Sequence, residues 1–291
     1  MLKSFYMNER RPKQRIEQKS RRMTMRFAVT ARGDERSHML KEQLEQALIE
    51  RGSHRDVVTP EIVISIGGDG TMLQAFHSYL DQVEEITLVG IHTGHLGFYA
   101  DWRPEEMDEL IQHIADDNIA TVEYPLLELS IDYADGSTNK LLALNECTIK
   151  SFNQTLVCDL SIRGDYFETF RGDGLCISTP SGSTAYNKAL GGAIVHPALE
   201  AIQITEMASI NNRVYRTIGS PMLLPKHHDV EIRPVNPIDF QLTYDHYASI
   251  VHQNVKSIRC RVSDKKVKFA RFRSFPFWQR VRESFLAEER S

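Results

Sequence analysis

The chain has 291 residues, of which 41% are hydrophobic and 25% charged, a composition that excludes global disorder and suggests about two domains. No apolar run is long enough to span a membrane, and the four cysteines lack CxxC spacing, which favours a reducing, cytoplasmic location. The net charge of −4 combines basic ends, residues 1–24 and 256–291, with an acidic middle, and so acidic a body argues against nucleic-acid binding.

Residues 1–24 form the first segment, with eight Lys and Arg against two Asp and Glu and no sustained apolar period. We expect a disordered basic extension, because such a segment has little apolar surface to bury. A regulatory or nucleic-acid-binding arm is the alternative.

Residues 25–121 alternate short apolar strands with amphipathic helices. The strands are expected at Met25–Thr30, Glu61–Ile66 and Ile86–Ile91, and the helices at 35–51, 71–80 and 104–116. This alternation predicts an α/β domain built on a doubly wound parallel sheet.

In residues 122–255 the hydrophobic pattern changes to the alternation that is typical of antiparallel strands. Strands are expected near 126–133, 141–150, 156–163, 166–171, 174–179, 229–233, 240–244 and 248–252. They predict a β-rich, sandwich-like domain. The closing segment, 256–291, contains an amphipathic helix near 274–286 that we expect to pack onto a domain, with a membrane-surface helix as the alternative.

The first candidate site is the glycine-rich run Gly67, Gly68, Asp69, Gly70 and Thr71, where a buried strand turns into a helix. Glycines allow a ligand to approach the backbone, and free N–H groups at a helix start suit phosphate. The run matches neither a Walker A loop nor GxGxxG. Asp69 could act as a general base, a metal partner or both, or could only cap the helix.

The second candidate site is Asn145-Glu146, which interrupts the apolar strand expected at 141–150. Neighbours on a strand point to opposite faces, so this pair cannot lie on one solvent face. An amide and a carboxylate could bind a ribose diol, and a strand end or bulge is the alternative.

The third candidate site runs from Arg171 to Tyr186 and joins a second Gly-Asp-Gly run, 172–174, to a hydroxyl-rich loop. The hydroxyl and backbone groups could bind a polar ligand, and Tyr186 could stack on a ring. A serine nucleophile is disfavoured because the loop does not match GxSxG, and a plain polar turn is the alternative.

A fourth motif, His92–Tyr99, follows the third parallel strand and therefore lies at the same sheet edge as Asp69. Two histidines occur in it without a third ligand at a telling spacing. Loop packing and a ligand-stacking Phe98 are favoured over a metal site.

The four motifs in this order, GGDGT, HTGHLGFY, NE and GDGLCISTPSGSTAY, resemble the NAD kinase family of bacterial type. The resemblance runs from about Met25 to the closing FWQRVRESF, and the long third motif is its most specific part. It implies transfer of a phosphoryl group from ATP or polyphosphate to the adenosine-ribose 2′-hydroxyl of NAD, with a divalent cation such as Mg²⁺ and no predicted protein ligands for it. It also implies a homo-oligomer whose chain end packs back on the α/β domain.

By this resemblance Asp69 would take the hydroxyl proton, and the other residues would contact NAD. Those contacts are Gly70, Phe98, Asn145, Glu146, Arg171, Asp173, Ser181, Thr184, Ala185, Tyr186, Asn187, Lys188, Ala208 and His246. Ser181 stands where the family often has Thr, which keeps the hydroxyl. Another kinase with a GGDG turn, acting on a lipid or a sugar, and a non-enzymatic NADP(H) sensor are the alternatives, with an NADP phosphatase as a minor third.

Overall fold

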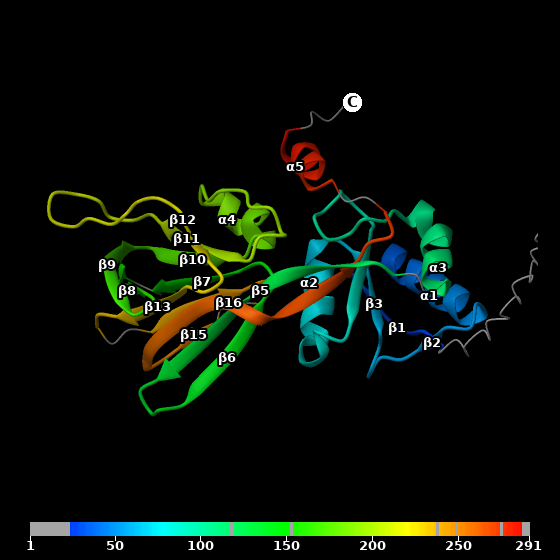
Figure 1. Cartoon of the computed structure of the whole chain (residues 1–291), viewed down its shortest axis with the longest axis horizontal. Coiled ribbons are helices and arrows are strands. Elements are labelled where there is room, and N and C mark those ends of the chain that lie inside the picture. Colours follow the sequence, from blue (N-terminus) through cyan, green and yellow to red (C-terminus); the bar gives the residue numbers. More distant parts are fainter. Residues whose placement is uncertain are drawn as a thin grey trace, which may run out of the picture.

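The computed structural model describes residues 24–286 apart from five two-residue gaps, 117–118, 152–153, 237–238, 248–249 and 274–275. The extension expected over 1–24 therefore lies, except for Thr24, outside the described residues. Figure 1 shows two parts side by side: helices with a sheet on one side, and layered strands on the other.

The first part is the doubly wound α/β unit predicted from the sequence. Its elements are β1 (Arg26–Ala31), α1 (Glu35–Glu50), β2 (His54–Arg55), β3 (Ile62–Gly67), α2 (Asp69–Ser78), η1 (Leu80–Gln82), β4 (Thr87–His92), η2 (Pro104–Glu106) and α3 (Met107–Ala115). Strands β2, β1, β3 and β4 pair in parallel in that order. The carboxyl ends of β1, β3 and β4 therefore meet at one edge, where ligands bind in such sheets.

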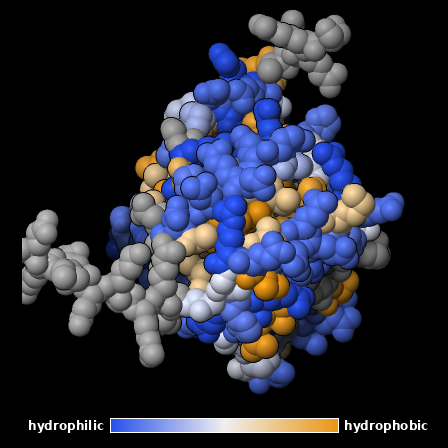
Figure 2. All heavy atoms as spheres, turned by 90° about the vertical axis from the view of Figure 1, so that its right-hand side faces the viewer, coloured by the Kyte–Doolittle hydropathy of each residue, from blue (hydrophilic) through white to orange (hydrophobic). Residues whose placement is uncertain are grey.

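Helices cover both faces of this parallel sheet. Apolar side chains of α1 and α3 pack with Phe27, Ile62 and Ile64, whereas those of α2 pack with Val63 and Leu88 on the other face. Alternate strand residues thus enter different cores, as the two-residue period requires. The side of the molecule that Figure 2 shows is mostly hydrophilic, with scattered apolar residues.

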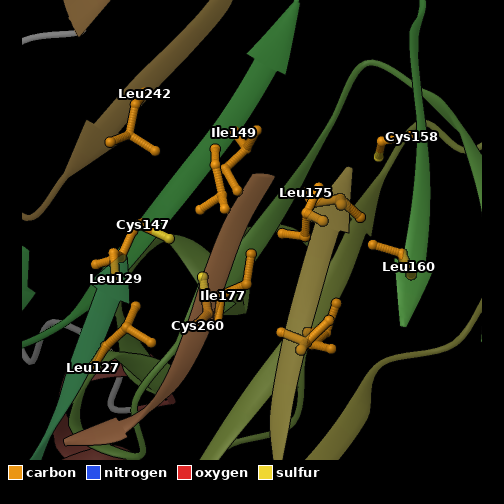
Figure 3. Close-up of a cluster of buried hydrophobic side chains, with 14 of the residues drawn as sticks. Leu127, Leu129, Cys147, Ile149, Cys158, Leu160, Leu175, Ile177, Leu242 and Cys260 are labelled. Carbon is orange, nitrogen blue, oxygen red and sulfur yellow. The ribbon is translucent and has the colours of Figure 1, made fainter. Parts of the chain in front are cut away.

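The second part is a sandwich of two sheets. Its elements are β5 (Thr121–Tyr133), β6 (Thr138–Ala143), β7 (Glu146–Ser151), β8 (Leu156–Ile162), β9 (Asp165–Gly172), β10 (Gly174–Ser178), η3 (Ser181–Thr184), α4 (Tyr186–Ala189), β11 (Ala201–Met207), β12 (Met222–Pro225), β13 (Asp229–Pro234), β14 (Phe240–Tyr244), β15 (Ile250–His252) and β16 (Val255–Ala270). A six-stranded antiparallel sheet, in the order β12-β11-β10-β7-β14-β15, faces the antiparallel half of a ten-stranded sheet. Leu129, Ile149, Leu175 and Cys260 belong to the core between them (Figure 3).

Two long strands, β5 and β16, run from one part into the other (Figure 1). They pair antiparallel along nearly their whole lengths, and β16 also pairs in parallel with β4 through Lys268 and Phe269. The expected domain limits at 122 and 256 therefore fall within or beside strands that both parts share. Strands β11, β12 and β16 were not predicted from the sequence.

The single strand expected over 141–150 is wrong in one respect. It is two strands, β6 and β7, in different sheets, and the chain changes sheet at Leu144 and Asn145. The polar pair thus marks the crossing point.

The last helix, α5 (Phe277–Phe285), lies near the junction of the two parts (Figure 1). Within the described ranges, no helix is long and apolar enough to cross a bilayer.

Candidate active site

The glycine-rich turn places Asp69 at the first position of α2, directly after the fully buried strand β3. Gly68 is the N-cap, and a Cβ at Gly67 would collide with the side chain of Thr71, so this turn has no room for a larger residue there. The first N–H groups of an α-helix have no acceptor within the helix, and they carry the positive end of its dipole. The turn can therefore receive phosphate oxygens beside the Asp69 carboxylate.

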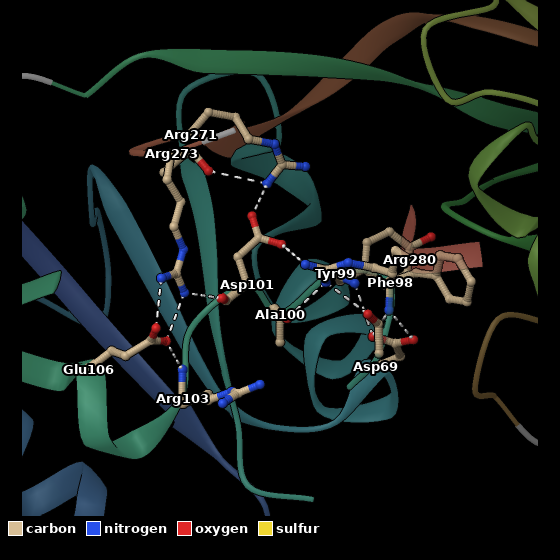
Figure 4. A network of polar contacts seen from close by, with 12 residues as sticks. Asp69, Phe98, Tyr99, Ala100, Asp101, Arg103, Glu106, Arg271, Arg273 and Arg280 are labelled. Carbon is tan, nitrogen blue, oxygen red and sulfur yellow. Dashed lines mark hydrogen bonds and ion pairs between the residues drawn. The ribbon is translucent and has the colours of Figure 1, made fainter. Parts of the chain in front are cut away.

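Asp69 is held in one orientation by the loop that follows β4 (Figure 4). The Phe98 N–H donates to Oδ1 and Oδ2 at 3.0 and 2.9 Å, and the Tyr99 N–H donates to Oδ1 at 3.1 Å. Gly97 packs so closely that a Cβ there would collide with the carboxylate. A carboxylate has about four acceptor positions, so these contacts leave one on Oδ2 for a further proton.

Tyr99 connects the first two candidate sites. Its backbone holds Asp69, its hydroxyl donates to Asn145 Oδ1, and its ring stacks on Phe269 at 5.4 Å between centroids. Burial raises the pKa of the Tyr99 hydroxyl well above its usual value, so it stays a donor. Tyr99 belongs to the fourth motif, but its role was not predicted from the sequence.

The hydroxyl-rich loop fixes the backbone beside Asn145. The hydroxyls of Thr179 and Ser181 both donate to the Leu144 carbonyl, at 2.6 and 3.0 Å, and the Thr179 N–H donates to the Asn145 carbonyl at 2.8 Å. A Cβ at Gly182 would collide with the Asn145 backbone. The hydroxyl-rich loop therefore fixes the backbone position of Leu144 and Asn145.

A buried carboxylate supports the same turn from the other side. Asp245 accepts the N–H groups of Leu144 and Asn145 at 2.9 and 2.7 Å, and it pairs with His77 Nε2 at 2.7 Å. His77 lies on α2, the helix that begins with Asp69. Asp245 and His77 were not predicted from the sequence, because neither belongs to a local motif.

Glu146 is buried beside Asp245, and its Oε2 atom has no hydrogen-bond partner among the described residues. Burial raises its pKa to about 8, and the nearby Asp245 charge adds to the rise, while a hydrogen bond from the Tyr186 backbone opposes it. Near neutral pH this carboxyl group is therefore largely protonated. It can both donate to and accept from a sugar hydroxyl.

The third motif lines a cavity of about 690 Å³ that brings three predicted residues together: Asp173, Tyr186 and Ala208. Ala208 takes a positive φ of 46°, which turns the chain out of β11 at the cavity wall. The remaining lining residues are Lys150, Ser151, Gln154, Leu190, Glu206 and Met207. An aromatic ring among polar groups suits a nucleotide base and its hydroxyls.

Other predicted contacts lie around these groups. The Arg171 guanidinium stacks over Tyr215 at 4.4 Å, and the Lys188 ammonium lies over Phe285 at 4.1 Å. Phe98 stacks on Phe285 at 5.7 Å. Gly70 is exposed at the start of α2.

Three predicted residues, Thr184, Ala185 and Asn187, make hydrogen bonds within the protein that hold the hydroxyl-rich loop in place. Asn187 is fully buried and accepts the Thr205 hydroxyl at 2.7 Å, while the Thr184 hydroxyl donates to the Ser181 carbonyl at 3.2 Å. The Ala185 N–H donates to the Gly182 carbonyl at 2.9 Å. His246 is exposed, with its ring 5.3 Å from that of His77.

Comparison with known proteins places this geometry in a family. Residues 9–119 match the family described as ATP-NAD kinase N-terminal domain, and residues 144–272 match ATP-NAD kinase C-terminal domain. The chain is 60% identical over 263 residues to the NAD kinase of Geobacillus stearothermophilus, covering 90% of this chain and 97% of that protein. It is 58% identical over 265 residues to NAD kinase 1 of Bacillus subtilis, covering 91% and 99%.

Two solved structures share the fold. The crystal structure of yeast NADH kinase complexed with NADH has a TM-score of 0.76 at 18% identity, covering 92% of this chain and 89% of that one. The structure of an NAD kinase from Archaeoglobus fulgidus in complex with ATP has a TM-score of 0.70 at 22% identity, covering 89% and 99%.

A glycine-rich turn that presents a carboxylate at a helix start, linked to a buried Asn-Glu pair on this two-part fold, is typical of a nucleotide-binding phosphotransferase. The chain belongs to the NAD kinase family, because both family descriptions and the curated relatives match it over most of its length. The resemblance stated from the sequence is therefore confirmed.

Proposed function

We propose that Asp69 is the general base of an NAD kinase reaction in which ATP is the phosphoryl donor. The 2′-hydroxyl oxygen of the adenosine ribose of NAD forms a bond to the γ-phosphorus, the bond from that phosphorus to the bridging oxygen breaks, and ADP leaves. The hydroxyl proton passes to Asp69 Oδ2. NAD kinase activity itself follows from the family, and the lipid or sugar kinase, the NADP phosphatase and the sensor lose their support.

One observation carries the assignment of the base: three backbone hydrogen bonds orient the Asp69 carboxylate at the phosphate-binding turn and leave an acceptor position on Oδ2. Tyr99 then links this carboxylate to Asn145. A ribose held by Asn145 and Glu146 would therefore present its hydroxyl toward Asp69. A carboxylate that accepts the proton in the transition state lowers the barrier of a poor nucleophile.

The dinucleotide would occupy the cavity lined by Asp173, Tyr186 and Ala208, with Tyr186 against a base. Arg171, Lys188 and the exposed His246 are not among the lining residues of this cavity, and they are proposed as further contacts of the dinucleotide beyond it. The neighbours crystallised with NADH and with ATP support these two ligand classes.

Magnesium fits this site without a dedicated set of protein ligands. Among the described residues, no three His, Cys, Asp or Glu side chains are placed to hold one ion. Mg²⁺ commonly keeps several waters and binds through substrate phosphates, so phosphates and waters would hold it here, and the open Oδ2 position of Asp69 stays available for the hydroxyl proton. Bound in this way, it would supply neutralisation of the phosphate charge, which the chain does not provide with a Walker lysine.

We further propose a cytoplasmic homo-oligomer. The four cysteines are free and buried, which fits a reducing compartment. Exposed apolar side chains, among them Tyr166, Val214, Ile218 and Leu223, gather on β9 and around the β11–β12 connection and could pair with a second copy.

The test is an endpoint assay of the purified protein with NAD, Mg²⁺ and ATP, with NADP read by a strictly NADP-dependent dehydrogenase. Parallel reactions replace ATP with polyphosphate or omit the magnesium. We expect NADP with ATP only when Mg²⁺ is present. NADP with polyphosphate alone would overturn the proposed donor, and NADP formed without any divalent cation would overturn the proposed need for the metal.

A further inference from the structure

The last helix of the chain contacts the loop that orients Asp69. Arg280 of α5 is buried, with 8% of its surface exposed, and its Nη1 atom donates to the carbonyls of Gly97 and Ala100 at 2.8 and 3.0 Å (Figure 4). The two carbonyls belong to residues nearly two hundred positions earlier in the sequence. One nitrogen therefore joins both ends of a four-residue segment.

The residues between those two carbonyls are Phe98 and Tyr99, whose N–H groups are the donors to Asp69. The carbonyls at the two ends of the segment accept hydrogen bonds from Arg280, and the N–H groups of its two middle residues donate to the Asp69 carboxylate. A change in the curvature of this segment would move both N–H donors. The guanidinium therefore fixes the shape on which the orientation of Asp69 depends.

We propose that Arg280 is a positioning residue for the Asp69 carboxylate, acting through the segment from Gly97 to Ala100. The proposal rests on the proposed role of Asp69 as general base. In this proposal Arg280 does not bind the substrate: it sets the position of the Asp69 carboxylate through the loop backbone, in addition to the attraction between its charge and that carboxylate.

A network of ion pairs holds the guanidinium itself in place (Figure 4). Arg280 Nη2 lies 2.9 Å from Asp101 Oδ1, and Arg271 Nη1 lies 2.7 Å from Asp101 Oδ2. Arg273 donates to the Asp101 carbonyl and pairs with Glu106. Asp101 therefore keeps a partner when Arg280 is replaced, so the variants should fold.

Aromatic contacts connect the same helix to the cavity side. Phe285 stacks on Phe98 and also receives the Lys188 ammonium over its ring. Phe277 lies 6.3 Å from Phe98 between ring centroids. The final helix thus touches both the Asp69 loop and α4, the helix whose Tyr186 lines the cavity.

The experiment measures kcat, KM for NAD and melting temperature for Arg280→Ala, Arg280→Lys and the control Arg282→Ala, an exposed arginine of the same helix. We expect Arg280→Ala to lower kcat about 10- to 100-fold, the scale of a small misplacement of a catalytic group, with KM changed less than about 3-fold. Lysine can pair with Asp101 but lacks the planar fork, so Arg280→Lys should keep the melting temperature and lose part of kcat. Arg282→Ala should match the wild type.

Two further arms separate positioning from general stability. Millimolar, non-denaturing guanidinium should restore part of kcat to Arg280→Ala and none to Asp69→Asn. In the Asp69→Asn background, Arg280→Ala should cause little further loss, because both changes act on the same group. An unchanged kcat, a purely KM effect, or full additivity in the double variant would overturn the proposal. A near-normal rate for Asp69→Asn alone would instead overturn the proposed base.

Discussion

Asp69 and Glu146 are two acidic residues of one candidate site, and their hydrogen-bonding environments in the fold are opposite. Asp69 accepts three backbone hydrogen bonds from a single loop, whereas Glu146 has a buried oxygen with no partner among the described residues. The first is fixed in direction before substrate arrives. The second is left unsatisfied in a place where a ligand hydroxyl can complete it. This difference is expected if Asp69, the proposed base, is oriented before the reaction and Glu146 contributes to the binding of the substrate.

The largest effect is expected from Asp69→Asn, which keeps the size of the side chain but cannot accept the hydroxyl proton. We expect kcat to fall about 10²- to 10⁴-fold, the range of a general base, with NAD affinity nearly unchanged. Steady-state kinetics and calorimetric NAD binding measure the two quantities. A rate near that of the wild type would show that another group takes the proton.

The next largest effect is expected where the loop presses on Asp69. A Cβ at position 97 collides with the Asp69 carboxylate, so Gly97→Ala must displace one or the other. We expect a loss in kcat of about 10²-fold, since a misplacement of about 1 Å costs that much. Gly94→Ala is the matched control, because a Cβ there meets nothing within 4 Å. Equal kcat values for the two variants would contradict the preorganised base.

Glu146→Gln tests the recognition side. At neutral pH the amide keeps both the donor and the acceptor of the protonated carboxyl, so we expect KM for NAD to change less than about 3-fold, whereas Glu146→Ala should raise it about 10-fold, the value of a hydrogen bond to a buried group. Glu146→Gln should also be more stable than the wild type at alkaline pH, because it has no buried charge to form. Glu283→Gln, on the exposed face of α5, is the control.

The pH dependence of that stability gain has a definite sign. The pKa of Glu146 is about 8 in the folded state against 4.5 for the ordinary group, so the folded state binds the extra proton. The wild type therefore loses stability between pH 4.5 and 8 relative to Glu146→Gln, by about 2–5 kcal/mol. Urea unfolding of both proteins across this range measures it, and a constant difference would show that the carboxyl has the same pKa in the folded and unfolded states.

The smallest effect is expected from shortening the chain at its start. Removing residues 1–24 takes away the basic extension and starts the chain at Met25, directly before β1. We expect melting temperature and kcat to stay within error of the full chain. A large loss of either would mean that the extension contributes to the fold or to the site.

Local patterns in the sequence predicted what depends on local structure. The glycines before Asp69, the period of α1 and the break at Asn145 each follow from neighbours in the chain. The sequence could not predict that Tyr99 bonds Asn145 or that Asp245 holds the same turn, because those contacts join residues 46 and about 100 positions apart. It also missed β16, whose alternation is hidden by a run of charged side chains that pair across to β5, such as Arg261 with Glu128.

The two shared strands limit how such a protein can be recombined. Strands β5 and β16 bond to each other along their length and reach from the sandwich to β4, so a cut between the two parts severs a continuous ladder. A chimera that joins the first part of one relative to the second part of another must therefore inherit both strands as one block. The smallest unit that can be exchanged across this boundary therefore contains β5 and β16 together, although the sequence pattern indicates two separate modules.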